Sequence, residues 1–171
     1  IDKITIKVEG KILTNLPHSK KIIPSVLDRS YGINKEYELT TINNIDSYTV
    51  YYVNKYNDNN YYVPVTKYVN RENTEPVKVI IKELSSSPIY ETNLMSHLNA
   101  GVILNDYELD YHNLKLNFNE LLLNDPDSNK ILEEVIYTIG LSMNNVYKDL
   151  ETVSFYVNNN EIYTLTLSDL K

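Results

Sequence analysis

Cysteine is absent from the 171 residues, and glycine is rare. The lack of cysteine excludes disulfides, cysteine zinc sites and thiol nucleophiles. With four glycines and no G-x-S-x-G sequence, the chain has neither a glycine loop for phosphate nor a nucleophile elbow. No apolar run approaches the roughly 20 residues of a transmembrane helix. These absences exclude several classes of enzyme.

Positive charge is also scarce. The net charge is −7, and only Arg29 and Arg71 of the 16 basic residues are arginines. The chain has 23 Asn and 16 Tyr but one Ala, a bias that the AT-rich codons of a low-GC genome explain. Lys67, Lys78 and Lys82 supply little charge for a phosphate backbone, and no GXXG loop is present. We therefore expect no nucleic-acid partner.

The remaining composition is that of a globular protein. Hydrophobic residues make up 42% and charged residues 23% of the chain, and its length suits one domain with an appendage. The first residue is Ile1 rather than Met. We expect any signal peptide or lipid anchor to lie upstream, and membrane contact to occur only through such a segment.

The N-terminal quarter differs in pattern from the rest. Residues 1–16 alternate apolar and polar side chains around Glu9-Gly10, which predicts a β-hairpin. Residues 17–46 lose this periodicity and are predicted to be a linker or extended loop. The hairpin is similar in pattern to residues 151–162, so it is either a chance likeness or the end of a preceding repeat. In the second case its apolar side chains should dock on the downstream domain or on another molecule.

Residues 47–171 are predicted to form one α+β domain. The expected sheet is mixed or antiparallel, with two amphipathic helices packed on one face in ββαββαββ order, preceded by the hairpin. Pro64 places its strand at an edge or a bulge. The segments are strands at 48–53 and 61–69, a helix at 76–84, strands at 102–104 and 114–118, a helix over 132–143 and a hairpin at 153–167.

The predicted core consists of apolar residues spaced at helical or strand periods. Its members are Val77, Ile80, Ile81, Leu84, Leu116, Phe118, Leu132, Val135, Ile139, Val153 and Phe155.

The two helix starts are predicted from capping residues. Thr74 precedes the first helix, and Asp125 or Ser128 can cap the second. The sequence from Asp125 also imitates the opening of a calcium loop. Its sixth position is Lys130 rather than Gly and its twelfth is Ile136 rather than Glu, so we predict an ordinary helix start.

No group of residues forms a convincing catalytic or metal site. Asp110 and His112 share a strand face, but no second His or HExxH sequence supports a metal. Ser96 and His97 are adjacent in sequence, which does not aim one at the other. We therefore predict no metal, no cofactor and no enzymatic activity.

Two tyrosine pairs could contact a glycan. Tyr51-Tyr52 and Tyr61-Tyr62 lie on predicted strands, where tyrosine is common for structural reasons. Stacking on a sugar needs no charge, so contact with a glycan remains open.

The stretch from Tyr48 to Leu167, about 70% of the chain, resembles the GerM domain family of sporulation and spore germination. The resemblance rests on an ordered series of segments. They are the strand 49–53, the helix 75–84, the family-signature segment Leu94-Met95-Ser96-His97-Leu98, the strand 114–119, the helix 131–139 and the strand 153–157. Asn99 stands where the family usually has Pro, and Asn159 where it usually has Gly. Asn tolerates positive φ, so the second change is mild.

The resemblance implies an assembly role rather than catalysis. Family members are similar in fold to ring-building modules, and they are usually exported, membrane-anchored lipoproteins of endospore-forming Firmicutes. It implies an extracytoplasmic interaction module of the cell envelope that supports a mother cell–forespore channel complex, with other proteins of that complex as partners. Leu94, Met95, Ser96 and Leu98 would be structural signature residues. The alternative is a cell-envelope glycan-binding domain or hydrolase, and the oligomeric state remains open.

Overall fold

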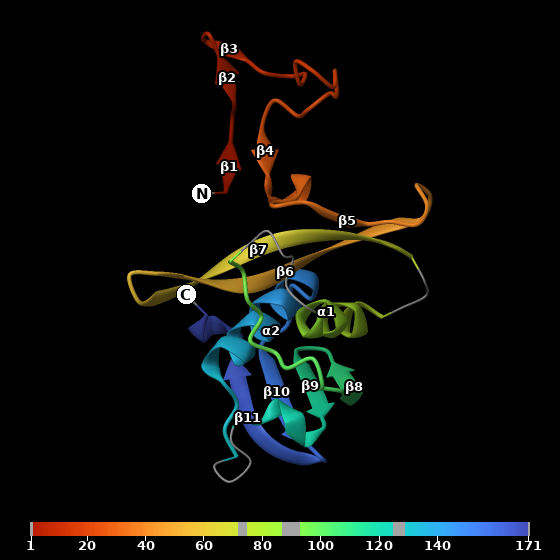
Figure 1. Cartoon of the computed structure of the whole chain (residues 1–171), viewed down its shortest axis with the longest axis vertical. Helices are drawn as coiled ribbons and strands as arrows, with labels where there is room; N and C mark the ends of the chain where they lie inside the picture. The colour runs from red at the N-terminus through yellow and green to blue at the C-terminus, as the bar shows by residue number, and fades with distance from the viewer. Residues whose placement is uncertain (1, 72–74, 87–92, 125–128, 171) are drawn as a thin grey trace.

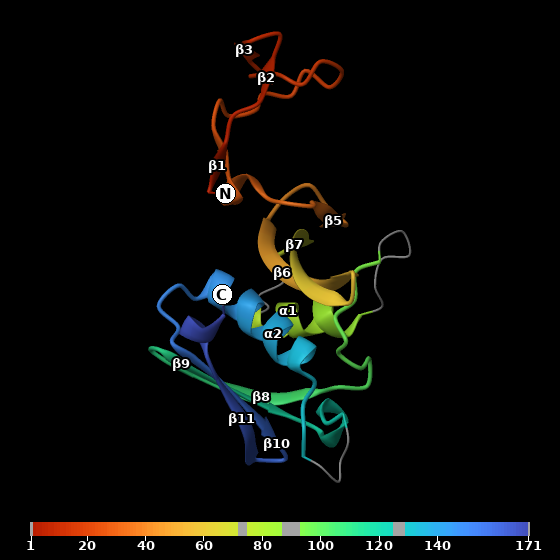
Figure 2. The ribbon, with the colours of Figure 1, turned by 90° about the vertical axis from the view of Figure 1, so that its left-hand side faces the viewer.

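Among the described residues, two α-helices lie between two β-sheets in the body of the chain (Figures 1 and 2). The structure is a computed structural model and describes residues 2–71, 75–86, 93–124 and 129–170. In chain order the body consists of β5 (Glu36–Glu38), β6 (Ile45–Tyr56), β7 (Asn59–Asn70), α1 (Pro76–Ser85), β8 (Leu104–Asp110), β9 (Asn113–Phe118), η2 (Glu120–Leu122), α2 (Glu133–Val146), β10 (Thr152–Val157), β11 (Asn160–Thr166) and η3 (Leu167–Asp169). The predicted α+β class is confirmed, with the strands divided between two sheets instead of forming one.

The first sheet is built on the long β6–β7 hairpin. Asn57 and Asp58 form its turn with φ of 47° and 62°, the conformation that two-residue hairpin loops favour. β5 lies on the other side of β7 and pairs in parallel with Lys67–Val69. Pro64 lies beyond that paired stretch, so β7 is a middle strand near Lys67 but an edge strand at Pro64. This explains how the sheet accommodates a proline.

The second sheet has the order β11-β10-β9-β8. β9 and β10 pair in parallel and are joined by α2, whereas both outer pairs are antiparallel. The predicted strand at 102–104 is wrong in its start, because β8 begins at Leu104. Val102 is instead buried next to a turn, where its N–H donates to the carbonyl of Asn99.

The core lies between the sheets and around both helices. Every predicted core residue is buried except Leu132, which is partly buried because it precedes the first turn of α2 in an extended conformation. The predicted core omitted apolar residues of the β6–β7 hairpin and of the second sheet. The fully buried ones are Val50, Val65, Leu114 and Leu165.

The predicted caps lie outside the described residues. Thr74 precedes α1, which begins at Pro76 after Glu75. Asp125 and Ser128 also fall outside the description, and α2 begins later than expected, at Glu133. Before α2, the N–H of Asn124 donates to the carbonyl of Lys130. This backbone hydrogen bond, rather than a side-chain cap, is the contact that the structure describes there.

The N-terminal residues form an arm that stands away from the body in both views (Figures 1 and 2). The arm contains β1 (Lys3–Ile4), β2 (Lys7–Val8), β3 (Lys11–Ile12), β4 (Leu27–Asp28) and η1 (Arg29–Tyr31). β2 and β3 form the expected hairpin around Gly10, but β1 pairs with β4 instead of joining it. Residues 17–46, predicted as a linker, supply β4, η1 and β5. The apolar side chains of the arm are largely exposed, among them Ile4, Ile6, Val8 and Ile12.

Candidate functional site

The family-signature segment packs on the edge of β6 that faces away from β7. Met95 pairs antiparallel with Val53, whose N–H donates to the carbonyl of Met95 at 2.7 Å and whose carbonyl accepts from Met95 at 2.9 Å. Ser96 and Leu98 are buried, and Leu94 packs against the core. Met95 is 52% exposed. The segment fixes the chain after α1 onto the first sheet and leaves one of the four predicted side chains available to a partner.

Ser96 and His97 differ in burial although they are adjacent in sequence. The Ser96 hydroxyl is buried and accepts the N–H of Leu98 at 3.2 Å. His97 is exposed and has a φ of 58°. The structure therefore does not bring the two together as nucleophile and base.

Both departures from the family pattern have local hydrogen bonds. The side-chain oxygen of Asn99 accepts from the N–H of Gly101 at 2.8 Å and closes a turn. Asn159 has a φ of 67° in the β10–β11 turn. It exchanges two hydrogen bonds with Asn117, of 2.7 Å between the amide side chains and 3.0 Å from the Asn159 N–H. The asparagines thus satisfy polar groups of these loops.

A buried ion cluster joins the first sheet to α1. The ammonium of Lys67 lies 2.5 Å from a carboxylate oxygen of Glu36 on β5 and 3.2 Å from one of Glu83 on α1. Lys67 and Glu83 side chains are each 4% exposed. Burial by itself lowers the pKa of Lys67, but the contact with Glu36 and the charge of Glu83 raise it above its ordinary value. The lysine therefore stays charged and holds three elements together.

Sequence reasoning missed this cluster, although the strand pattern contains the signal. Lys67 follows Val65 and precedes Val69 at period two, so it points to the same side of β7 as these apolar residues. Tyr52 lies beside it, with the ammonium 5.8 Å from the ring centroid. Burial raises the pKa of Tyr52 to about 12, which keeps its hydroxyl protonated.

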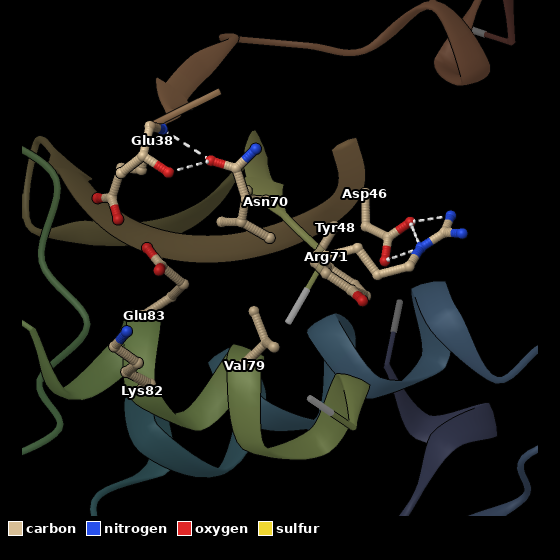
Figure 3. A pocket seen from close by; sticks show the side chains of 10 residues that line it. Glu38, Asp46, Tyr48, Asn70, Arg71, Val79, Lys82 and Glu83 are labelled. Atoms are coloured by element: carbon tan, nitrogen blue, oxygen red, sulfur yellow. Dashed lines mark hydrogen bonds and ion pairs between the residues drawn. The ribbon is translucent and has the colours of Figure 1, made fainter. Parts of the chain in front are cut away.

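A small pocket of about 120 Å³ opens between the first sheet and α1 (Figure 3). Several of its polar groups have partners within the chain. The carboxylate of Asp46 receives two 3.0 Å contacts from Nε of Arg71, and these hydrogen bonds lower the pKa of Asp46. Oδ1 of Asn70 accepts from the N–H and hydroxyl of Thr40. These contacts tie the end of β7 to β6 and to the residues that follow β5.

The predicted weak metal candidates are not assembled into a site. Nδ1 of His112 lies 2.5 Å from the carbonyl oxygen of Asp149, and this contact raises the pKa of His112. Across residues 2–71, 75–86, 93–124 and 129–170, no group of three or more His, Cys, Asp or Glu side chains could hold a metal ion. Asp125 and Asp127, which open the apparent calcium loop, lie outside the described residues.

The tyrosine pairs divide between the core and the surface. Tyr52 is buried, and the ring of Tyr62 lies 5.6 Å from that of Tyr137. The hydroxyl of Tyr51 accepts from Arg29 at 3.4 Å, and Tyr61 is exposed. Three of the four tyrosines therefore have contacts within the chain, while Tyr61 is exposed.

The two-sheet body with α1 and α2 and its signature segment define a member of a known domain family. A family model described as Germane, sporulation and spore germination, matches residues 49–163. The chain belongs to this family, which confirms the expected resemblance.

Two comparisons with proteins of Bacillus subtilis agree with the family. The chain is 28% identical over 164 residues to "Spore germination protein GerM" of strain 168, a match that covers 92% of this chain and 44% of the relative. The solved structure of the tandem GerMN domains of the sporulation protein GerM gives a TM-score of 0.74 at 28% identity, covering 94% of this chain and 56% of that one. The chain thus spans about half the length of the relatives it matches.

None of the helices in the described residues is both long and apolar enough to cross a membrane.

Proposed function

We propose that the chain is a non-enzymatic interaction module of endospore formation. It acts outside the cytoplasm in the cell envelope of a Firmicute, attached through a lipid anchor of the longer protein. There it supports assembly of a complex that connects mother cell and forespore. Its partners are other proteins of that complex.

The match of residues 49–163 to the sporulation and spore germination family carries this proposal. The body offers surfaces suited to a protein partner. β8 is an edge strand of the second sheet, with the side chains of Leu109 and the following Tyr111 exposed. An edge strand presents backbone donors and acceptors to another chain. Met95 adds a second exposed apolar side chain at the edge of the first sheet.

A genetic experiment tests the role in sporulation. The gene is deleted in the source bacterium, and heat-resistant spores are counted with and without a wild-type copy. We expect a loss of spores that the wild-type copy restores. Normal spore numbers in the deletion strain would contradict the proposal.

A cross-linking experiment tests the interaction. A photo-reactive residue replaces Leu109 or Met95 in the complementing copy, and Lys20 in the exposed arm serves as the control position. We expect cross-links to one envelope protein from positions 109 or 95 during sporulation, and not from position 20. Equal products at all three positions, or release of sugars when the purified chain is incubated with cell walls, would argue against an assembly module.

A further inference from the structure

A groove of about 590 Å³ runs across the outer face of the first sheet, beneath η1. One wall comes from Arg29 to Ile33, the floor from β6 and β7, and another side from the C-terminal end of α2 and Lys148 beyond it. Binding sites for small ligands typically enclose about 300–1,000 Å³. The volume of the groove therefore lies in the range of small-ligand sites. It is also larger than the volume of the pocket in Figure 3.

The wall of the groove is held firmly against the sheet. The N–H of Ile33 donates to Oγ1 of Thr66 at 2.8 Å, and the N–H of Thr66 donates to the carbonyl of Ile33 at 2.7 Å. Gly32 has a φ of 88°, and a Cβ there would lie 2.8 Å from the hydroxyl of Tyr68. Glycine thus allows the close approach that places Arg29 above the sheet.

The groove is cationic although the whole chain carries a net charge of −7. Arg29 and Lys148 both line it, and the described lining residues include no carboxylate. Within the described residues neither cation has an ion-pair partner, whereas Lys67, Arg71 and Lys115 all do. The carboxylate of Asp28, next to Arg29, instead accepts from the N–H and hydroxyl of Ser30.

Polar side chains that can bind hydroxyl groups lie between these two cations. The hydroxyls of Ser47 and Thr49 and the amide of Asn145 line the groove. Within the described part of the chain none of the three has a side-chain hydrogen-bond partner. They can both donate and accept, as recognition of a sugar requires.

We propose that this groove binds a carboxylate-bearing saccharide of the cell wall. Arg29 and Lys148 contact the carboxylates of the glycan, and Ser47, Thr49 and Asn145 contact its hydroxyl and acetamido groups. The charge of the groove favours an acidic glycan over a neutral one, and the polar groups between the cations favour a sugar over a simple anion. This inference rests on the proposed location in the cell envelope but not on the assembly role, and the binding measurement below does not involve assembly.

The test is a titration of the whole chain, followed by ¹H–¹⁵N NMR, with the disaccharide N-acetylglucosaminyl-N-acetylmuramic acid. We expect shifts confined to amides that line the groove. Arg29→Gln and Lys148→Gln should each weaken binding about tenfold, since each removes a charge-assisted contact. Lys130→Gln, an exposed lysine outside the groove, should leave affinity unchanged. The amide spectra of the variants show whether each remains folded.

Three probes separate the alternatives. Di-N-acetylglucosamine, which lacks the carboxylate, should bind at least fivefold more weakly than the acidic disaccharide. Inorganic phosphate should also bind more weakly than the acidic disaccharide, because it is too small to contact both cations and all three polar side chains at once. Equal affinity for phosphate, tighter binding of a glycerol phosphate oligomer, or equal weakening by Lys130→Gln would overturn the proposal, as would the absence of shifts in the groove.

Discussion

Lys67 contacts groups from two other elements with a single ammonium group. It is buried between the carboxylates of Glu36 and Glu83, which belong to β5 and α1. Removing one member of a buried ionic group leaves the remaining charges without compensation. The role of Lys67 is therefore larger than that of an exposed lysine in an ion pair such as Lys115 with Glu108.

Replacing Lys67 with Met should lower the free energy of unfolding by about 3–5 kcal/mol, because two carboxylates lose their counter-charge. Urea denaturation of the purified chain measures this change. Lys115→Met, which breaks an exposed pair, serves as the control and should lower the free energy of unfolding far less. The combination Lys67→Met, Glu36→Gln and Glu83→Gln should recover part of the loss. Equal effects of Lys67→Met and Lys115→Met would contradict a buried role for the cluster.

The pKa of His112 offers a second test at the residue scale. The carbonyl of Asp149 raises its pKa above the ordinary value of 6.5, and the charge of Glu151 adds to this effect. A raised pKa means that the contact stabilises the fold fully below pH 6.5 and that this stabilisation is lost as the pH rises through the folded-state pKa. An NMR titration of the imidazole C–H resonances should give a midpoint above 6.5. A midpoint at or below 6.5 would show that the contact does not hold in solution.

At the scale of elements, one side chain of α2 provides a hydrogen-bond acceptor for the edge of β6 that faces away from β7. The N–H of Tyr51 donates to Oγ of Ser142 at 2.9 Å, and that hydroxyl donates to the carbonyl of Thr138 at 2.6 Å. Ser142 and Thr138 are fully buried. A strand edge thus finds its partner in a helix side chain instead of another strand, a few residues from where Met95 bonds to Val53.

Ser142→Ala should destabilise the chain by about 1–3 kcal/mol, because the Tyr51 N–H loses its acceptor inside the protein. Thermal or urea denaturation measures the loss. Ser154→Ala, on the outer face of the second sheet, is a matched control. Its hydroxyl lies 2.7 Å from that of Thr164 in an exposed position, so the change should stay within about 0.5 kcal/mol. A neutral Ser142→Ala would indicate that water replaces the hydroxyl.

The sequence predicted the elements better than it predicted how they join. The stripe Val77, Ile80, Ile81 and Leu84 correctly predicted the buried face of α1, since local spacing is enough to define such a face. The predicted start of β8 was wrong because Val102 is a buried residue next to a turn. An apolar residue in the sequence indicates burial, but it does not distinguish a turn from a strand. In the signature segment, Ser96 and Leu98 are buried while Met95 remains exposed. The spacing of apolar residues could not predict this difference, because it depends on the pairing of Met95 with Val53.

At the scale of the whole molecule, the arm and the body differ in how much apolar surface they bury. Among the described residues of the arm, Ile23 is buried, whereas Ile4, Val8 and Ile12 are about half exposed. The body has a continuous core that includes Phe118, Phe155 and Ile139. Local stability follows the number of buried apolar contacts, so the two parts should open with different free energies.

Hydrogen–deuterium exchange followed by mass spectrometry should show this difference. We expect amides of residues 2–28 to exchange far faster than those of β9, β10 and α2, because short strands with exposed side chains protect their hydrogen bonds poorly. β7 should show intermediate to strong protection, since it is paired on both sides near Lys67. Equal protection of arm and body at the same protein concentration would contradict this prediction, and protection that rises with concentration would indicate self-association.

The division into two sheets could not be predicted from strand order alone. An alternating pattern shows that a strand has a buried face but not which other strand lies beside it. β5 escaped prediction because Glu36–Glu38 is short and charged, and its pairing with β7 depends on the buried contact of Glu36 with Lys67. The groove escaped prediction for the same reason, since Arg29 and Lys148 are distant in sequence and meet only after the chain has folded.

The parallel pairing of β9 with β10 also has a consequence for how fast the chain folds. The hairpins β6–β7 and β10–β11 close over short loops, but β9 cannot meet β10 until the intervening segment has formed α2. Contacts between residues far apart in sequence slow folding, because loop closure costs entropy before any contact is gained. During synthesis, the edge of β9 that faces away from β8 therefore remains unpaired until β10 has left the ribosome. β10 thus sets the moment at which this edge ceases to be exposed to aggregation.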